Sequence, residues 1–121
     1  MSRRAARDRP VRPSEPSGVP RTYRVDVTRT AERDLAAIHA FIVRDNPAAA
    51  AAWLDTIERN IVSLRRWPRR CPVIPEAPEL AVEYRHLVDG PYRTIFRVAR
   101  SRVIILRVIH GAQLLDLDIL E

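Results

Sequence analysis

The sequence predicts an α+β fold with a helical hairpin packed on a three- to four-stranded antiparallel sheet. Two observations carry this prediction. Residues 31–67 repeat apolar side chains at helical spacing on both sides of one Asp-Asn-Pro break, and residues 82–110 form three extended segments joined by tight turns. One more extended segment precedes the helices, so the expected order is β-α-α-β-β-β.

The first strand and first helix follow from the change of apolar period. Residues 22–28 alternate apolar and polar side chains, which predicts a strand with Tyr23, Val25 and Val27 facing inward. Thr30 stands before a first turn that contains acidic residues, so we expect the helix to begin at Ala31. The apolar face of that helix comprises Ala31, Leu35, Ile38 and Ile42.

The break between the helices has a clear chemical signature. Asn46 suits an N-cap, and Pro47 suits the first helical position, where a missing N–H costs nothing. Because the connection is short, the two helices must run antiparallel. Trp67-Pro68 ends the second helix, whose apolar face comprises Ala50, Trp53, Leu54, Ile57, Ile61 and Leu64.

The rest of the sheet follows a Pro-rich connector, residues 68–80, which is ordered only if Val73, Ile74 and Leu80 dock on the domain. Asp89-Gly90 is a strong hairpin signal, and a second tight turn covers residues 100–102. The expected strands are Val82–Val88, Tyr92–Val98 and Val103–His110. The last is the most apolar, which indicates a central strand or one covered on both faces.

Strand alternation also predicts a basic face. If Phe96 and Val98 point inward, the neighbouring arginines point outward. In-register pairing then gathers four arginines on the face away from the helices: Arg85, Arg93, Arg97 and Arg107. Such a face is either simply solvated or a surface that binds a target or partner, since the guanidinium fork suits phosphate and carboxylate alike.

Composition bounds the remaining possibilities. Apolar residues make up 46% of the 121 residues, enough for one core, and no apolar run approaches a membrane span. All 21 basic residues are arginine, which excludes lysine chemistry. Residues 1–20 are rich in Pro and Arg and predict a disordered tail, followed by a single domain over residues 21–121. The single cysteine, Cys71, suits a reducing compartment.

Few residues have the spacing of a reactive centre. The three histidines and Cys71 lie too far apart along the chain to predict a metal site, and no cofactor motif is present. Because histidine can act as an acid or a base near neutral pH, His86 and His110 are candidates for acid–base work, although a structural role for either stays open. Trp53 and Trp67 are expected in the core or in a groove for a partner.

Six phrases in this order resemble a known family. They run from Tyr23-Arg24-Val25 through Asp45-Asn46-Pro47 and Trp67-Pro68 to the segments Tyr92–Val98 and Ile105–Gly111, with Ala31-x-x-Asp34-Leu35-x-x-Ile38 in the first helix. Residues 22–113 thus resemble the RelE/ParE superfamily of toxins from type II toxin–antitoxin modules, and within it the ParE-like, plasmid-stabilisation branch.

The resemblance implies a cytoplasmic bacterial toxin that a cognate antitoxin, encoded by an adjacent gene, neutralises in a hetero-oligomer. ParE-like members bind and poison DNA gyrase without known catalysis, and this is the activity we expect. RelE-like members instead enter the ribosome and cut mRNA with basic residues. Here Tyr84-Arg85-His86 stands where RelE carries two lysines, Gly111-Ala112-Gln113 replaces an expected arginine, and no tyrosine follows Tyr92.

Site residues follow from both alternatives. For a nuclease, the catalytic candidates are Arg93, which keeps the arginine of the Tyr-Arg phrase, with His86 and His110. For a protein-binding toxin, the target surface is Arg85, Arg93, Arg97 and Arg107. The antitoxin is expected to lie over the hairpin and the sheet edge, contacting Trp53, Ile57, Ile61, Leu64 and Trp67.

Overall fold

The computed structural model describes residues 22–76 and 82–111. The predicted tail over residues 1–20, Leu80 of the connector and the acidic-apolar C-terminal segment lie outside the described residues. The element order is β1 (Arg24–Val27), α2 (Arg29–Asp45), α3 (Pro47–Ser63), the 3₁₀ turn η1 (Pro68–Arg70), β2 (Arg85–Asp89), β3 (Tyr92–Ala99) and β4 (Arg102–His110). The α+β class and the predicted order are confirmed.

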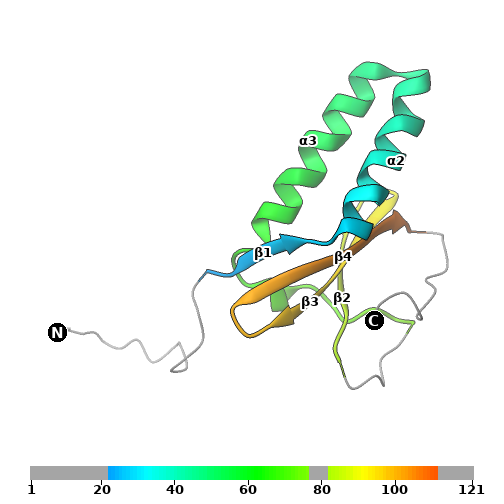
Figure 1. Cartoon of the computed structure of the whole chain (residues 1–121). Helices are drawn as coiled ribbons and strands as arrows, with labels where there is room; N and C mark the ends of the chain where they lie inside the picture. The colour runs from blue at the N-terminus through cyan, green and yellow to red at the C-terminus, as the bar shows by residue number, and fades with distance from the viewer. Residues whose placement is uncertain (1–21, 77–81, 112–121) are drawn as a thin grey trace.

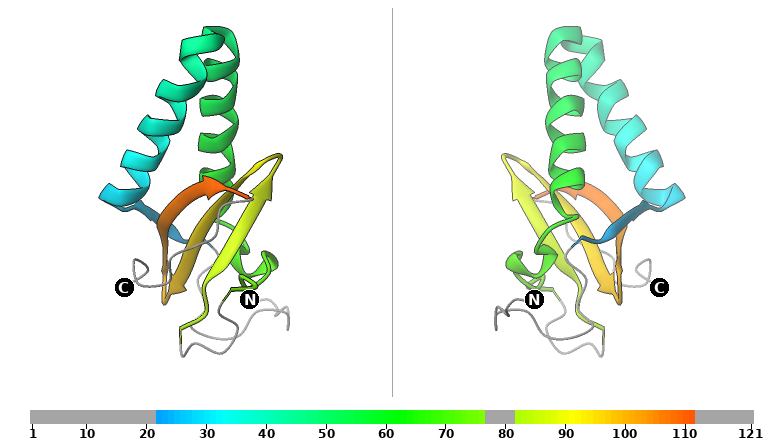
Figure 2. Two further views of the ribbon diagram at one scale, coloured as in Figure 1. Left: turned by 90° about the vertical axis from the view of Figure 1, so that its right-hand side faces the viewer. Right: turned by 90° about the vertical axis from the view of Figure 1, so that its left-hand side faces the viewer.

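The helical hairpin rises from one face of the sheet, as Figure 1 shows, and the view in Figure 2 separates the two layers. Thr28, not Thr30, caps α2: its hydroxyl accepts a hydrogen bond from the Ala31 N–H. The prediction for the second helix holds, since Asn46 caps α3 through the Ala49 N–H and Pro47 is its first residue.

The sheet has the strand order β1-β4-β3-β2. Strands β2, β3 and β4 pair antiparallel, as predicted, but β1 pairs parallel with β4, so the sheet is mixed. Two parallel strands need a long connection between them, because the chain must return to the same end of the sheet. The helical hairpin and the strands β2 and β3 provide this connection between β1 and β4. Strand β4 is central, as its apolar sequence indicates.

A register shift in β4 divides its side chains differently from simple alternation. Ile95 pairs with Arg107 while Phe96 pairs with Ile105, so Leu106 is an extra residue opposite the β3 ladder. Val103, Ile105 and Val108 therefore all face the helices and join the main core. Simple alternation would place Leu106 and Val108 on one face, but the bulge puts Val108 in the main core and Leu106 on the opposite face.

The face of the sheet away from the helices is not an open basic surface. A second apolar cluster of Ile74, Tyr84, Ile95 and Ile109 is buried there, with Leu106 packed against it. Ile74 comes from the connector, and its N–H donates to the Tyr84 carbonyl at 2.8 Å, while Val73 bridges to Arg85. The connector therefore docks through Ile74 and covers this face.

Candidate functional site

The four arginines predicted to share one face lie in three different places. Arg85 is opposite Phe96, on the helix side of the sheet, and donates to the Cys71 carbonyl at 2.6 Å and to Glu83 at 2.9 Å. Arg107 reaches Asp34 of α2. The prediction of a single arginine face is therefore wrong: the register of β2 places Arg85 opposite the inward-facing Phe96, and Arg107, next to the bulge in β4, reaches α2.

The other two, Arg93 and Arg97, keep the orientation away from the helices. Arg97 is half-buried near the end of β3. Arg93 is 5% exposed, although arginine is among the residues least often buried. Burial of a guanidinium requires a paired anion, and the connector supplies one.

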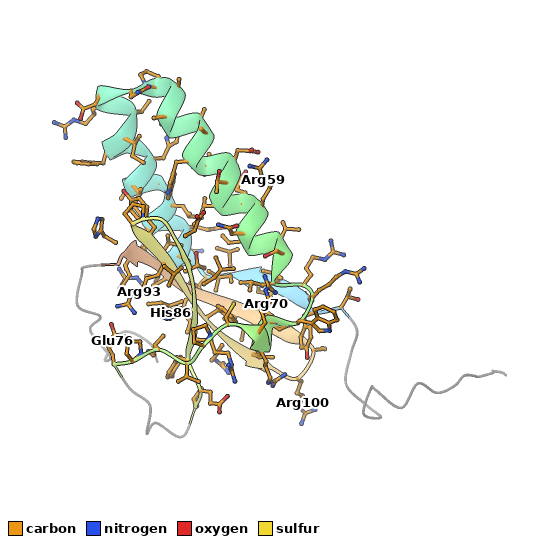
Figure 3. The ribbon with its side chains drawn as sticks, turned by 180° about the vertical axis from the view of Figure 1, so that it is seen from behind. Arg59, Arg70, Glu76, His86, Arg93 and Arg100 are labelled. Carbon is orange, nitrogen blue, oxygen red and sulfur yellow. The ribbon has the colours of Figure 1, made fainter. Side chains whose placement is uncertain are left out.

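Arg93, Glu76 and His86 form the most developed polar cluster on this face, which Figure 3 shows with all three residues labelled. Both terminal nitrogens of the Arg93 guanidinium donate to the two Glu76 carboxylate oxygens, so the pair is bidentate. His86 lies opposite Ile95 on the neighbouring strand, which places its Nδ1 3.2 Å from Arg93 Nη1.

The electrostatics of this cluster are those of a closed ion pair. The hydrogen bond from Arg93 lowers the pKa of Glu76, so this carboxylate stays ionised. Burial, helped by the Arg93 charge, lowers the pKa of His86, and its imidazole is neutral near pH 7 with Nδ1 able to accept from Arg93. The charge of the Arg93 guanidinium in this cluster is already neutralised by the Glu76 carboxylate.

His110 is separated from this cluster. It pairs in register with Tyr92, and because neighbouring residues of a strand alternate, Arg93 and Tyr92 point to opposite faces. The His110 ring stands edge-on to Tyr92 at 5.5 Å, and Tyr92 contacts Trp53 at 5.6 Å. Of the three catalytic candidates, the structure brings together His86 and Arg93 and leaves His110 on the other side of the sheet.

His110 instead borders a pocket of about 380 Å³ between α2 and the end of β4. Asp34 and Arg107 form part of its wall, and Phe41, 65% exposed, lies at its rim. Asp34 accepts from Arg107 at 2.7 and 3.0 Å and from the Val108 N–H at 3.0 Å. This arrangement fixes α2 to the bulged strand and leaves the Asp34 carboxylate occupied.

The predicted antitoxin contacts also divide. Ile57, Ile61 and Leu64 are buried in the main core, so their side chains hold α3 to the sheet. Trp53 is half-buried, whereas Trp67 is 80% exposed and so lies outside the core. A contact of Trp67 with the antitoxin stays a prediction. A groove of about 550 Å³ does lie between the helices, and Val27, Leu35, Ala36, Leu54, Ile61 and Val62 line it with Glu32 and Glu58.

Sequence reasoning missed Glu76 and Asp34 as partners. Glu76 lies in the Pro-rich connector, where no period marks an inward residue, and Asp34 fits an ordinary first-turn acid. Within residues 22–76 and 82–111, no cluster of His, Cys, Asp and Glu has the arrangement of a metal site. In the same residues, no helix combines the length and apolarity that crossing a bilayer requires.

Comparison with known proteins gives a consistent family. Residues 25–115 match the ParE toxin of the type II toxin–antitoxin system, parDE. No curated protein matches the chain.

Solved structures with this fold include two toxin–antitoxin assemblies. The chromosomal ParDE system from P. aeruginosa shares the fold with a TM-score of 0.63 at 24% identity, over 75% of this chain and 98% of that one. The toxin–antitoxin complex RelBE2 from Mycobacterium tuberculosis has a TM-score of 0.51 at 33% identity, over 76% and 94%. With its family match over most of the described domain, the chain belongs to the ParE family of type II toxin–antitoxin system toxins.

Proposed function

We propose that this chain arrests bacterial growth by binding DNA gyrase in the cytoplasm, and that a cognate antitoxin holds it inactive. Membership in the ParE family supports a role as a toxin. The choice between gyrase binding and mRNA cleavage depends on whether the candidate catalytic residues, Arg93, His86 and His110, are available for phosphate chemistry.

The state of Arg93 is the observation that carries the proposal. Cleavage next to a ribose needs a cation free to stabilise a pentacoordinate phosphate. The Arg93 guanidinium is buried and both of its terminal nitrogens are bound to Glu76. A phosphate would have to displace a carboxylate and leave it buried without its partner, which is costly.

The histidines support the same conclusion. A general acid must be protonated to donate a proton to the leaving oxygen, and the lowered pKa of His86 makes its imidazole neutral at pH 7. His110 lies on the opposite face from Arg93, so the two do not address one phosphate. The chain therefore lacks, among its described residues, a convergent set of free acid, base and cation.

Gyrase supercoiling with the purified full-length chain tests the proposal directly. We expect inhibition of supercoiling and accumulation of cleaved DNA, while primer extension shows intact transcripts after induction in cells. The double variant Glu76→Leu/Arg93→Met removes the ion pair without leaving a lone charge, and it should retain growth inhibition. Cleaved mRNA, unaffected gyrase and loss of toxicity in the double variant would together establish the ribosome-dependent nuclease instead.

The groove between α2 and α3 is the surface we assign to the antitoxin. Its largely apolar lining, which includes the exposed residues Ala36 and Val62, suits an amphipathic helix. Val62 lies on its wall and is 54% exposed, so Val62→Asp should weaken neutralisation in a co-expression growth assay without destabilising the toxin. Phe41→Asp changes an exposed apolar residue on the other side of α2 and serves as the control. Full neutralisation of the Val62 variant would place the antitoxin elsewhere.

A further inference from the structure

One end of the domain gathers exposed arginines around an exposed tryptophan. Three connections bring them together: the Tyr23 N–H donates to the Arg65 carbonyl at 2.8 Å, the Arg24 N–H donates to the Ser101 carbonyl at 2.9 Å, and Arg24 pairs with Arg102 across β1 and β4. We call this the arginine–tryptophan surface. It comprises Arg24, Arg65, Arg66, Trp67, Arg69, Arg70, Arg100 and Arg102, all of them exposed.

Trp67 is held in an outward position by the backbone around it. It is 80% exposed, and its backbone is left-handed, with φ 49° and ψ 52°. Such a conformation is rare for a bulky side chain and costs free energy. Leu64 and Pro68 on either side are buried, and Arg70 donates to the Arg66 and Trp67 carbonyls at 2.7 and 3.2 Å. The turn therefore presents the indole ring in a fixed place.

The surface carries a large excess of positive charge. Among the ion pairs of residues 22–76 and 82–111, only those of Asp26 involve this surface, with Arg24 at 3.0 Å and Arg102 at 2.9 Å. Arg69 donates instead to the Tyr23 hydroxyl, and Arg70 to the Ser63 hydroxyl. Figure 3 shows Arg70 and Arg100 at this end, away from the Arg93, Glu76 and His86 cluster and from Arg59 higher on α3. A polyanion is the complementary ligand.

We propose that the arginine–tryptophan surface binds single-stranded nucleic acid, with the guanidinium groups contacting phosphates and Trp67 stacking on an unpaired base. Sites for single strands combine these two elements, a basic track and an aromatic platform. An acidic protein segment would pair with the same guanidinium groups, but its carboxylates offer no flat surface for the 80% exposed indole ring of Trp67, whereas an unpaired base does. This activity goes beyond gyrase binding and requires no gyrase.

Fluorescence anisotropy with labelled oligonucleotides of about 20 nucleotides tests the proposal on the full-length chain. The probes are poly-dT, poly-rU and a DNA duplex. Trp67→Ala should weaken binding of both single strands by about 5- to 100-fold, and Trp67→Phe should keep most of it. Binding to the duplex should not depend on Trp67. A difference in affinity between poly-dT and poly-rU would show whether the surface prefers single-stranded DNA or single-stranded RNA.

The salt dependence of the affinity distinguishes binding at this surface from non-specific attraction to the positive charge of the whole chain. The double variant Arg65→Gln/Arg66→Gln should reduce the slope of log affinity against log salt by about 1.4, since each single-strand phosphate contact contributes about 0.7. The matched control Arg33→Gln/Arg44→Gln removes two exposed arginines from α2 and should leave the slope unchanged. In a Trp53→Phe background, quenching of Trp67 fluorescence on binding would report stacking directly.

Three outcomes would overturn the proposal. Equal affinities of the parent chain and both Trp67→Ala and Trp67→Gly would show that the ring does not stack. Equal slopes in the two double-arginine variants would show attraction without a defined site. Weaker binding of purified antitoxin by the Trp67 variants, with oligonucleotide binding unchanged, would assign the surface to a protein. None of these results bears on gyrase inhibition.

Discussion

The carboxylate of Asp34 in α2 accepts two hydrogen bonds from the Arg107 guanidinium in β4, across 73 residues of sequence. A third, from the Val108 N–H, completes the contact beyond Ile105, where the pairing of β4 with β1 has ended. Asp34 therefore closes an exposed β edge and attaches the hairpin to the sheet with one side chain.

Asp34→Asn should destabilise the domain by about 2 kcal/mol, because both partners are only 16% exposed and the Arg107 guanidinium would lose the charge of the carboxylate that it contacts. Urea denaturation followed by circular dichroism measures this change. Asp55→Asn is the control: it breaks an exposed pair with Arg59 and should cost less than about 0.5 kcal/mol. Equal effects of the two substitutions would mean that the Asp34 contact adds nothing beyond a surface ion pair.

Stability should fall as pH decreases from about 8 to about 5, and His86 should account for a defined part of the loss. The folded-state pKa of His86 is lowered, so the unfolded chain binds the proton first, and acidification through the ordinary histidine range favours unfolding. Glu76, also with a lowered pKa, contributes stability that is lost only at more acidic pH, below the ordinary carboxylate range.

Urea denaturation across this pH range, for the parent chain and for His86→Gln, measures the effect. In the His86→Gln variant, the free energy of unfolding should depend less on pH near neutrality. Arg33→Gln, an exposed substitution on α2, is the control and should leave the parent profile intact. An unchanged profile in the His86 variant would show that the Arg93 neighbourhood does not set the protonation of this imidazole.

The parts of the fold that local chemistry determines were predictable from sequence. The hairpin follows from helical apolar spacing on either side of Asn46 and Pro47, and the structure uses both residues as predicted. The inward positions of Phe96 and Val98 also follow from alternation before any irregularity is met. In each case, the signal lies within a few residues of the feature that it determines.

The candidate site was less predictable because its contacts are long-range. The bulge at Leu106 breaks the alternation next to Arg107, whose guanidinium bonds to Asp34 of α2, and no residue type marks that position in the sequence. Glu76 neutralises Arg93 from a connector without a regular period. The sequence predicts Trp67 in the core or in a groove for a partner, and its left-handed backbone, which no sequence pattern marks, turns it out of the core.

Glu76→Gln should destabilise the domain by about 3 kcal/mol, because it leaves the buried Arg93 cation without its carboxylate. The double variant Glu76→Leu/Arg93→Met should recover most of that loss, since apolar side chains of similar volume suit this buried face next to Ile95. The free energies of unfolding of the two variants and the parent chain decide the point. A double variant as unstable as the single one would show that the ion pair itself, with His86, is required for the fold.

Trp67→Gly should stabilise the domain by about 1 kcal/mol, because glycine adopts φ 49° without the steric penalty that a tryptophan backbone pays there. The exposed indole ring contributes little packing in return, being 80% exposed. Arg100→Gly, at φ 58° in the turn between β3 and β4, provides a second site with the same backbone conformation and should act in the same direction. Thermal unfolding of both variants measures the effect. A loss of stability in Trp67→Gly with a gain in Arg100→Gly would mean that the indole ring makes a stabilising contact despite its exposure. That contact would then offset the backbone strain at Trp67 within the folded domain, without any ligand.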